Sequence, residues 1–373
     1  MNPARRQWLA LLAAAPALAR ADIDASAADD DRVRRGRELR FPRDHGAHLG
    51  ARTEWWYATG WLAAGGGSAP THGFQVTFFR SRTGLAEGLE SRFAARQLLF
   101  AHAAVTDLAA KKHRHAQRIA RWTGDPAAPL ARAALADCDV LLGGWSLVRE
   151  SAGGTSRYRT RVAADDFRFE LVLTRSQPLL LQGEAGFSRK GPDESEASHY
   201  YSEPQLMVQG ELALAGAPRP VRGSAWLDHE WSEQILHPEA VGWDWIGINL
   251  LDGSALTAFR LRRADGSALW AGGSFRAAGG PVQSFGSDAV RFVPGRVWVS
   301  PGSGARYPVA WQVETPAGRF GLRSLLDAQE LDGRGGTGAI YWEGLSELLD
   351  SQGARVGLGY LEMTGYAAPL KLG

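Results

Sequence analysis

The stretches Phe74-Gln-Val-Thr-Phe78 and Phe167-Arg-Phe-Glu-Leu-Val-Leu173 alternate apolar and polar side chains with a period of two. That period is typical of β-strands with one face buried. Further strands are expected at 255–261, 297–299, 309–313 and 357–365, with Gly-rich or Asp-Gly turns between them. Helical patterns are confined to 130–137 and a few residues near Ser346. The sequence therefore predicts an all-β fold.

The composition supports this fold class and bounds its size. The chain has 373 residues, of which 45% are hydrophobic and 22% charged, so a large core is available and wholesale disorder is excluded. With 45 Gly, 18 Pro and 3 Met, turns and strands are favoured over long helices. The length exceeds one small barrel, so we predict two consecutive antiparallel β-barrels, with domains at 44–231 and 232–373.

Two aromatic–acidic segments resemble each other across these halves. They are Thr53-Glu-Trp-Trp-Tyr-Ala-Thr-Gly60 and Gly242-Trp-Asp-Trp-Ile-Gly247. Each places paired aromatic residues beside a carboxylate just before a glycine. Two related barrels would produce such an echo.

The first 21 residues have the features of an export signal. Arg5 and Arg6 precede an apolar stretch at 8–19, and small residues follow at 19–21. That stretch is shorter than the roughly 20 residues that span a bilayer. The paired arginines also fit a twin-arginine signal, so a Sec or twin-arginine route to a periplasmic or secreted location is expected. Residues 22–43 are expected to form an extended leader, and the mature chain is expected to lack a transmembrane segment.

Charge and cysteine content exclude several classes of protein. Lys plus Arg number 42 and Asp plus Glu 40, a net charge of +2 without a basic block, so nucleic acid is not an expected partner. The single Cys138 excludes an internal disulfide and a cysteine-based metal centre within one chain.

Several standard active-site motifs are absent or out of context. A Gly-x-Ser-x-Gly elbow does not occur, and the glycines of 333–338 lie in a loop, which argues against a dinucleotide site. His229 is followed by Glu233, not by a histidine, at the zinc-protease spacing. A helix could align His229, Glu233 and His237 for a metal, but the β context argues against it. We therefore predict neither a metal nor a cofactor.

The densest polar and aromatic run is 223–231, Gly-Ser-Ala-Trp-Leu-Asp-His-Glu-Trp. On a strand, alternate side chains share a face, which groups Trp226, Asp228 and Glu230 against Leu227, His229 and Trp231. Facing an apolar barrel lumen, a carboxyl here would have a raised pKa and serve as an acid. The alternative is that these charges cap a barrel mouth and hydrogen-bond to the backbone.

A second candidate run is Glu54-Trp55-Trp56-Tyr57, in which large aromatics occupy both faces of a strand. One face can fill the core while the other lines a ligand cavity. The same logic applies to Trp243, Asp244 and Trp245. Weaker candidates are His102, His199, Tyr200 and Tyr201.

Several longer motifs resemble one known family. They are Phe41-Pro-Arg-Asp-His-Gly-Ala-His48, Arg52-Thr-Glu-Trp-Trp-Tyr-Ala-Thr-Gly-Trp61, Ala101-His102, Tyr200-Tyr-Ser-Glu-Pro204, Trp226-Leu-Asp-His-Glu-Trp231, Tyr341-Trp-Glu-Gly344 and Gly359-Tyr-Leu-Glu-Met-Thr-Gly-Tyr366. Together they resemble the AttH-type secreted proteins, relatives of bacterial carotenoid 1,2-hydratase (hydroxyneurosporene synthase). The resemblance implies two lipocalin-like barrels with a hydrophobic ligand site near their junction. The hydratase relatives add water to a terminal isoprenoid double bond without a cofactor, other relatives carry out cyclisation, and AttH proteins are often labelled secreted hydrolases.

These observations predict an exported binder of a lipophilic, isoprenoid or fatty-acyl molecule, with hydratase-type acid–base activity if it is an enzyme. The first alternative is a secreted hydrolase. The second is a non-enzymatic periplasmic partner of a lipid or export transporter of the ABC type, whose aromatics would form an exposed patch.

For a hydratase, Asp228 is the expected proton donor, with Glu54 or Asp244 in reserve. His229 or Glu230 would deprotonate the water. Tyr57 would anchor a hydrogen bond, and tryptophan faces would stabilise a carbocation. The expected ligand-binding residues are Trp55, Trp56, Trp226, Trp231, Trp243, Trp245, His102 and Tyr201.

Overall fold

The computed structural model describes residues 31–370, except 86, 87, 90, 92, 93, 126, 153, 215, 235 and 337. The export signal predicted at 1–21 lies outside the described residues. Regular structure in the described part is β, apart from two single-turn 3₁₀ helices, η1 (Arg43–His45) and η2 (Ser287–Ala289). The all-β prediction is confirmed. No helix in these residues is both long and apolar enough to cross a membrane.

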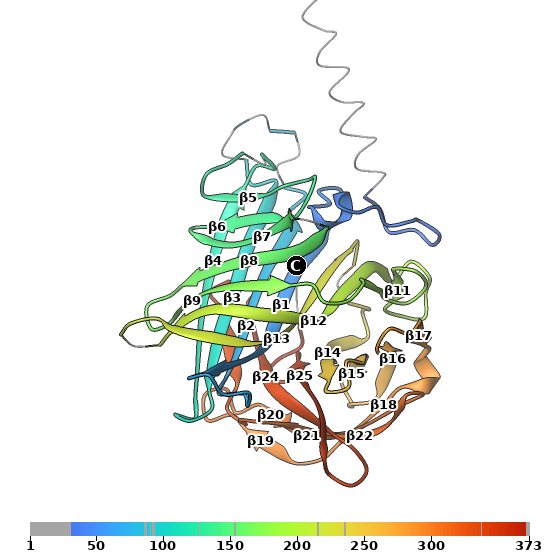
Figure 1. Ribbon diagram of the computed structural model, residues 1–373. Helices are drawn as coiled ribbons and strands as arrows, with labels where there is room; N and C mark the ends of the chain where they lie inside the picture. The colour runs from blue at the N-terminus through green and yellow to red at the C-terminus, as the bar shows by residue number, and fades with distance from the viewer. Residues whose placement is uncertain are drawn as a thin grey trace, which may run out of the picture.

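The N-terminal sheet is a nearly closed antiparallel barrel (Figure 1). Its strand order is β4-β3-β2-β1-β13-β12-β9-β8-β7-β6-β5, with β10 and β11 paired to β12. The bounds are β1 (Thr53–Ala64), β2 (His72–Arg82), β3 (Gln97–Asp107), β4 (Lys112–Trp122), β5 (Ala131–Ala133), β6 (Asp139–Leu142), β7 (Trp145–Ala152), β8 (Thr155–Ala163), β9 (Arg168–Thr174), β10 (Leu180–Leu181), β11 (Phe187–Arg189), β12 (Ala197–Ala213) and β13 (Arg219–Ser232). Contacts between β4 and both β5 and β6 bring the two edges together.

The second sheet has the order β17-β16-β15-β14-β25-β24-β22-β21-β18, with β23 paired to β24. Strands β19 and β20 form a separate ribbon. The bounds are β14 (Ala240–Leu250), β15 (Ala255–Arg263), β16 (Ala268–Arg276), β17 (Val282–Phe285), β18 (Arg291–Pro294), β19 (Val297–Val299), β20 (Arg306–Pro308), β21 (Ala310–Thr315), β22 (Gly318–Ser324), β23 (Glu330–Gly333), β24 (Ala339–Leu349) and β25 (Arg355–Met363).

Neither of the two predicted helical segments is helical in the structure, so that prediction is wrong. Ala131–Ala133 forms β5, and Ser346 lies within β24. Alanine and leucine are strong helix formers, but intrinsic propensity amounts to less than about 1 kcal/mol per residue, and pairing with neighbouring strands overrides it.

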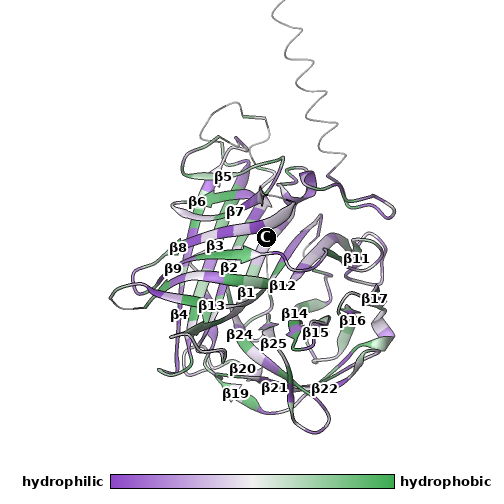
Figure 2. Ribbon diagram, in the orientation of Figure 1, coloured by the Kyte–Doolittle hydropathy of each residue, from purple (hydrophilic) through white to green (hydrophobic). Residues whose placement is uncertain are grey.

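Each sheet encloses its own hydrophobic core, and a third cluster joins them. Trp56, Phe74 and Leu227 are among the residues inside the N-terminal barrel, and Ile246 and Trp342 are among those inside the C-terminal barrel. The third cluster, which includes Tyr57, Trp226, Trp245, Phe259 and Tyr360, takes residues from the outer faces of both sheets. Figure 2 shows the alternation of hydrophobic and hydrophilic residues along the strands that makes two opposite faces possible.

Close backbone approach at two glycines sets the register of β14 against β25. Gly359 pairs with Ile248, and a Cβ atom added at Gly359 would lie 1.9 Å from the carbonyl oxygen of Gly247. The same register places Glu362 opposite Trp245. Backbone atoms cannot move aside as a flexible side chain would, so only glycine fits here.

We therefore expect Gly359→Ala to lower the free energy of unfolding by at least about 1–3 kcal/mol, the usual cost of overpacking. Urea unfolding monitored by tryptophan fluorescence measures this change. Gly67→Ala is the control, because its added Cβ would meet only the carbonyl oxygen of Ala64, at 3.8 Å. Equal stability of the two variants would contradict the assigned register.

Candidate functional site

A cavity of about 260 Å³ lies between the outer faces of the two sheets, outside both barrel lumens. Four carboxyl groups line it, those of Asp228, Glu230, Glu343 and Glu362. Among the lining residues, Lys190 is the only lysine or arginine. Its aromatic lining consists of Trp55, Tyr57, Phe79, Phe100, Tyr200, Trp243, Trp245, Phe259 and Tyr341. The arrangement is that of an apolar ligand site with a few polar groups.

Strand register brings distant polar residues into one row on the N-terminal barrel. His102, Thr77, Tyr57, Asp228 and Ser202 are successive partners across β3, β2, β1, β13 and β12. Neighbouring strands lie about 4.8 Å apart, so the row spans roughly 19 Å.

A second row lies on the C-terminal barrel. Glu343, Glu362, Trp245 and Phe259 are successive partners across β24, β25, β14 and β15. The ring centroids of Tyr57 and Trp245 are 5.4 Å apart, so the two rows meet across the cavity.

Asp228 is a buried carboxyl held by three hydrogen-bond donors. Its Oδ1 accepts from Ser202 Oγ at 2.5 Å and from Trp226 Nε1 at 2.6 Å, and its Oδ2 accepts from Tyr200 Oη at 2.7 Å. Tyr200 in turn accepts from Trp245 Nε1 at 3.2 Å, which directs the tyrosine proton toward Asp228. Burial raises the pKa of Asp228 to about 7, against the opposing effect of these donors.

Glu343 and Glu362 carry two further buried carboxyls of the cavity. They face each other across β24 and β25, and no lysine or arginine of the described residues forms an ion pair with either. Burial raises the pKa of Glu362 to about 7 and, reinforced by Glu362, raises that of Glu343 well above its usual value. Burial and these two carboxyls also raise the pKa of Tyr57.

The remaining ionisable groups of the cavity have partners of their own. Lys190 Nζ lies 2.9 Å from Glu230 Oε1 and stacks over the rings of Tyr200 and Phe259. His102 Nδ1 lies 2.6 Å from Tyr341 Oη, while burial lowers the pKa of this histidine to about 4. His102 is therefore neutral at pH 7.

Comparison with known proteins identifies the family of this chain. The sequence pattern of the AttH-like family matches residues 32–366. The chain belongs to the AttH-like family. A solved structure assigned as an AttH protein, from Nitrosomonas europaea, is 48% identical to this chain. The match covers 90% of this chain and 99% of that chain, with a TM-score of 0.82.

More distant structures share the fold of this AttH-like protein. Kievitone hydratase from Nectria haematococca is 16% identical, with 89% of this chain and 94% of that chain covered and a TM-score of 0.66. CghA bound to Sch210972 is 14% identical, with coverages of 84% and 88% and a TM-score of 0.53. No protein with a curated description matches the sequence.

The structure separates the predicted site residues of the AttH-like protein into two groups. Those that line the cavity are Trp55, Tyr57, His102, Asp228, Glu230, Trp243 and Trp245. Those that do not line it are Glu54, Trp56, Tyr201, Trp226, His229, Trp231 and Asp244. Of the second group, Trp226 still contributes, because its indole donates to Asp228.

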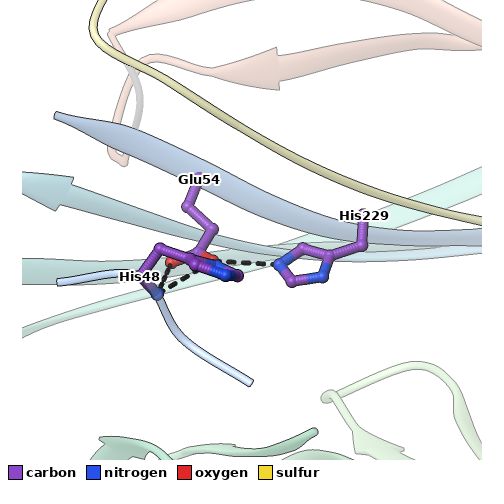
Figure 3. Close-up of side chains that lie close together, drawn as sticks. All are labelled: His48, Glu54 and His229. Atoms are coloured by element: carbon purple, nitrogen blue, oxygen red, sulfur yellow. Dashed lines mark hydrogen bonds and ion pairs between the residues drawn. The ribbon is translucent and has the colours of Figure 1, made fainter. Parts of the chain in front are cut away.

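Glu54 lies on the inner face of the N-terminal barrel, in a buried hydrogen-bond network (Figure 3). Its carboxylate accepts from His48 Nδ1 at 2.7 Å, His229 Nε2 at 2.9 Å and Arg80 Nε at 2.7 Å. Burial alone would raise the pKa of Glu54, but Arg80 and the two histidines outweigh it and hold that pKa well below its usual value. Tyr201 joins the network through His229 Nδ1, at 3.2 Å.

His48, Glu54 and His229 lie close enough together to hold a metal ion, but their bonding does not fit one. His48 directs its second ring nitrogen to Asp44 Oδ1 at 3.0 Å, so both ring nitrogens face carboxylates and neither is free to coordinate. The guanidinium of Arg80 already neutralises Glu54. The cluster is a buried hydrogen-bond network inside the N-terminal barrel.

Asp244 has the equivalent position in the C-terminal barrel. Its carboxylate accepts from Arg260 Nε at 2.7 Å, Arg262 Nη1 at 3.1 Å and Tyr366 Oη at 2.9 Å. Glu54 is the strand partner of Arg80, and Asp244 is the strand partner of Arg260. The aromatic–acidic echo in the sequence therefore corresponds to one acid–arginine pair inside each barrel.

Sequence reasoning missed Glu343, Glu362 and Lys190 as site residues. Glu343 and Glu362 each interrupt a short run of apolar residues, in Tyr-Trp-Glu-Gly-Leu and Tyr-Leu-Glu-Met, which is the available signal. Lys190 follows the short strand β11, and its sequence context offers no comparable signal.

The Glu54–Arg80 pair predicts a large stability effect. Glu54→Gln leaves the buried Arg80 without its counter-charge, so we expect the free energy of unfolding to fall by about 3–5 kcal/mol at pH 7. Because the folded-state pKa of Glu54 is lowered, its contribution is present above pH 4.5 and is lost as the pH falls further. Urea unfolding at pH 7 and at lower pH measures both effects.

The matched control is Glu170→Gln, which removes an exposed partner of Arg161. We expect a cost of about 0–1 kcal/mol there. Similar losses for both variants would show that the buried network does not stabilise the barrel as argued.

Proposed function

We propose that this AttH-like protein binds an apolar, alkene-bearing molecule between its two barrels and adds water to it, with Asp228 as the proton donor. The observation that carries the proposal is a carboxyl with a pKa of about 7 that faces an aromatic cavity. An isolated alkene is a weak base, so its protonation needs a neutral acid in dry surroundings.

Hydration is favoured over other proton-transfer reactions because one fold relative, at 16% identity, is named kievitone hydratase. That likeness shows a shared fold. Hydration by this chain is part of our proposal. An isoprenoid or fatty-acyl substrate suits the aromatic walls. Export to the periplasm or beyond remains part of the proposal and rests on the N-terminal sequence.

The residues around Asp228 fit this role step by step. The O–H bond of Asp228 breaks as its proton forms a C–H bond with the alkene, and the donors from Ser202, Trp226 and Tyr200 stabilise the carboxylate left behind. The resulting carbocation lies against indole and phenyl faces, where cation–π attraction is worth about 2 kcal/mol when desolvated. Water then adds to the cation and loses a proton.

The aromatic residues distinguish this proposal from the non-enzymatic alternative. A transporter partner was expected to display them on an exposed patch, whereas Trp55, Trp243 and Trp245 line the cavity. The secreted hydrolase and the transporter partner stay predictions from the sequence, because no specific feature of the structure favours either.

The test is Asp228→Asn, assayed with apolar alkenes in heavy-oxygen water. We expect the wild type to form an alcohol carrying one label and the variant to lose about 10²–10⁴-fold in rate, the usual contribution of a general acid. Since Asp228 must be protonated to act, the wild-type rate should fall as the pH rises above about 7. Mass spectrometry of the product measures both.

Asp288→Asn is the control, because Asp288 is exposed in η2. Binding is followed separately by quenching of the cavity tryptophans, which both variants should retain. Unchanged turnover in Asp228→Asn would remove Asp228 from its role. An absence of saturable quenching by every lipid class would contradict the ligand site itself.

A further inference from the structure

Two carboxyl groups of the C-terminal barrel face each other in the cavity, and no lysine or arginine in the described part of the chain forms an ion pair with either. Glu343 and Glu362 are direct partners across β24 and β25, so their Cβ atoms lie about 4.5–5.5 Å apart. Both line the cavity. Its one lysine, Lys190, is already paired with Glu230. Two ionised carboxylates at this distance in apolar surroundings repel each other strongly, so one proton is retained between them.

Unsatisfied polar atoms mark the same place as a site for a polar group. Glu343 Oε1 and Tyr57 Oη are buried, and neither makes a well-aligned hydrogen bond to a described residue, although the two side chains lie close enough to shift each other's pKa. Tyr57 projects from the opposite barrel, and both residues line the cavity. His102 Nε2 is unpartnered as well. A buried polar atom without a partner costs about 1–3 kcal/mol, which a water or a ligand hydroxyl would relieve.

We propose that Glu343 and Glu362 share one proton and act as the base that deprotonates the adding water, opposite Asp228. This inference rests on the proposed hydration and assigns its second proton-transfer group. The acid then belongs to the N-terminal barrel and the base to the C-terminal barrel, so the reaction requires both.

The proton balance closes without a further reactant. Asp228 loses its proton to the substrate carbon, the water oxygen forms the C–O bond, and an O–H proton of that water passes to the singly charged glutamate pair. Asp228 is then ionised and the pair is neutral. One proton lost from the pair to solvent and one regained by Asp228 restore the starting state.

Several titratable groups surround the pair and set its proton affinity. Those facing it are Tyr57 on β1, Asp228 and Glu230 on β13, Tyr341 on β24 and Tyr360 on β25. The tyrosines stay neutral at ordinary pH because burial raises their pKa values. The nearby carboxyls therefore disfavour a second negative charge on the pair.

The shared proton is tested directly by difference infrared spectroscopy. A protonated carboxyl has a carbonyl band that a carboxylate lacks. Asp228 is itself partly protonated near pH 7, so the measurement is made in the Asp228→Asn background. We expect such a band at pH 7 in Asp228→Asn and its loss when Glu343→Gln and Glu362→Gln are added. The exposed Glu211→Gln, added instead, should leave the band in place. Absence of the band in Asp228→Asn, or its survival in the triple variant, overturns the shared proton.

The catalytic role is tested by the pH dependence of hydration. A base must be ionised, so the wild-type rate should fall at low pH as the pair takes up its second proton. Glu362→Gln leaves Glu343 as the single base of the pair. Burial is the main cause of the raised pKa of Glu343, and no neighbouring carboxyl is left to share its proton, so this limb should move to higher pH. The double variant should lose about 10²–10⁴-fold in rate. A purely structural role would leave the acidic limb in place.

The outcomes separate this inference from the proposed function. A wild-type rate in the double variant overturns the catalytic role of the pair, even with Asp228 confirmed. If the wild type hydrates no alkene, the proposed function fails, the base role fails with it, and the infrared band alone decides the shared proton. Thermal unfolding checks that the variants are folded, and the single variants carry both measurements if the double variant is not.

Discussion

The packing of one barrel's outer face against the other is the constraint on which the site depends. Strands β1 and β13 are buried on both sides, with their own barrel core on one face and the second barrel on the other. Outer faces of barrels normally meet water and carry polar residues. Here the opposing sheet excludes water, so carboxyl groups on those faces lie in a dry, aromatic space. The exclusion of water raises the pKa values of these carboxyl groups into a range useful for catalysis.

Buried carboxyls in this protein are of two kinds, and arginine makes the difference. Inside each barrel, Glu54 and Asp244 meet guanidinium groups from the neighbouring strand, which neutralise the charge and hold the structure. Between the barrels, Asp228, Glu343 and Glu362 have hydroxyl or indole donors, or only each other. A carboxylate paired with arginine neither gives nor takes a proton near pH 7, whereas an unpaired one in apolar surroundings can.

This division also explains the aromatic–acidic echo between the two halves of the chain. Each segment supplies an acid to its own barrel and aromatic side chains to the space between the barrels, because successive residues of a strand face opposite ways. One short motif thus serves stability on one face and ligand contact on the other. The similarity in sequence was a sign of structure more than of catalysis.

The sequence by itself determined the all-β class and the faces that each side chain shares, since period-two alternation leaves little freedom within a strand. It correctly grouped Trp226, Asp228 and Glu230 against His229 and Trp231. Alternation does not say which face closes into a lumen and which meets the second barrel. Only the tertiary structure decided that Asp228 faces the cavity while Glu54 and His229 face the core, and only barrel packing brought Glu343 and Glu362 to the site. Those contacts join strands more than 100 residues apart, and such long-range pairing depends on how whole sheets close and pack, which no local pattern encodes.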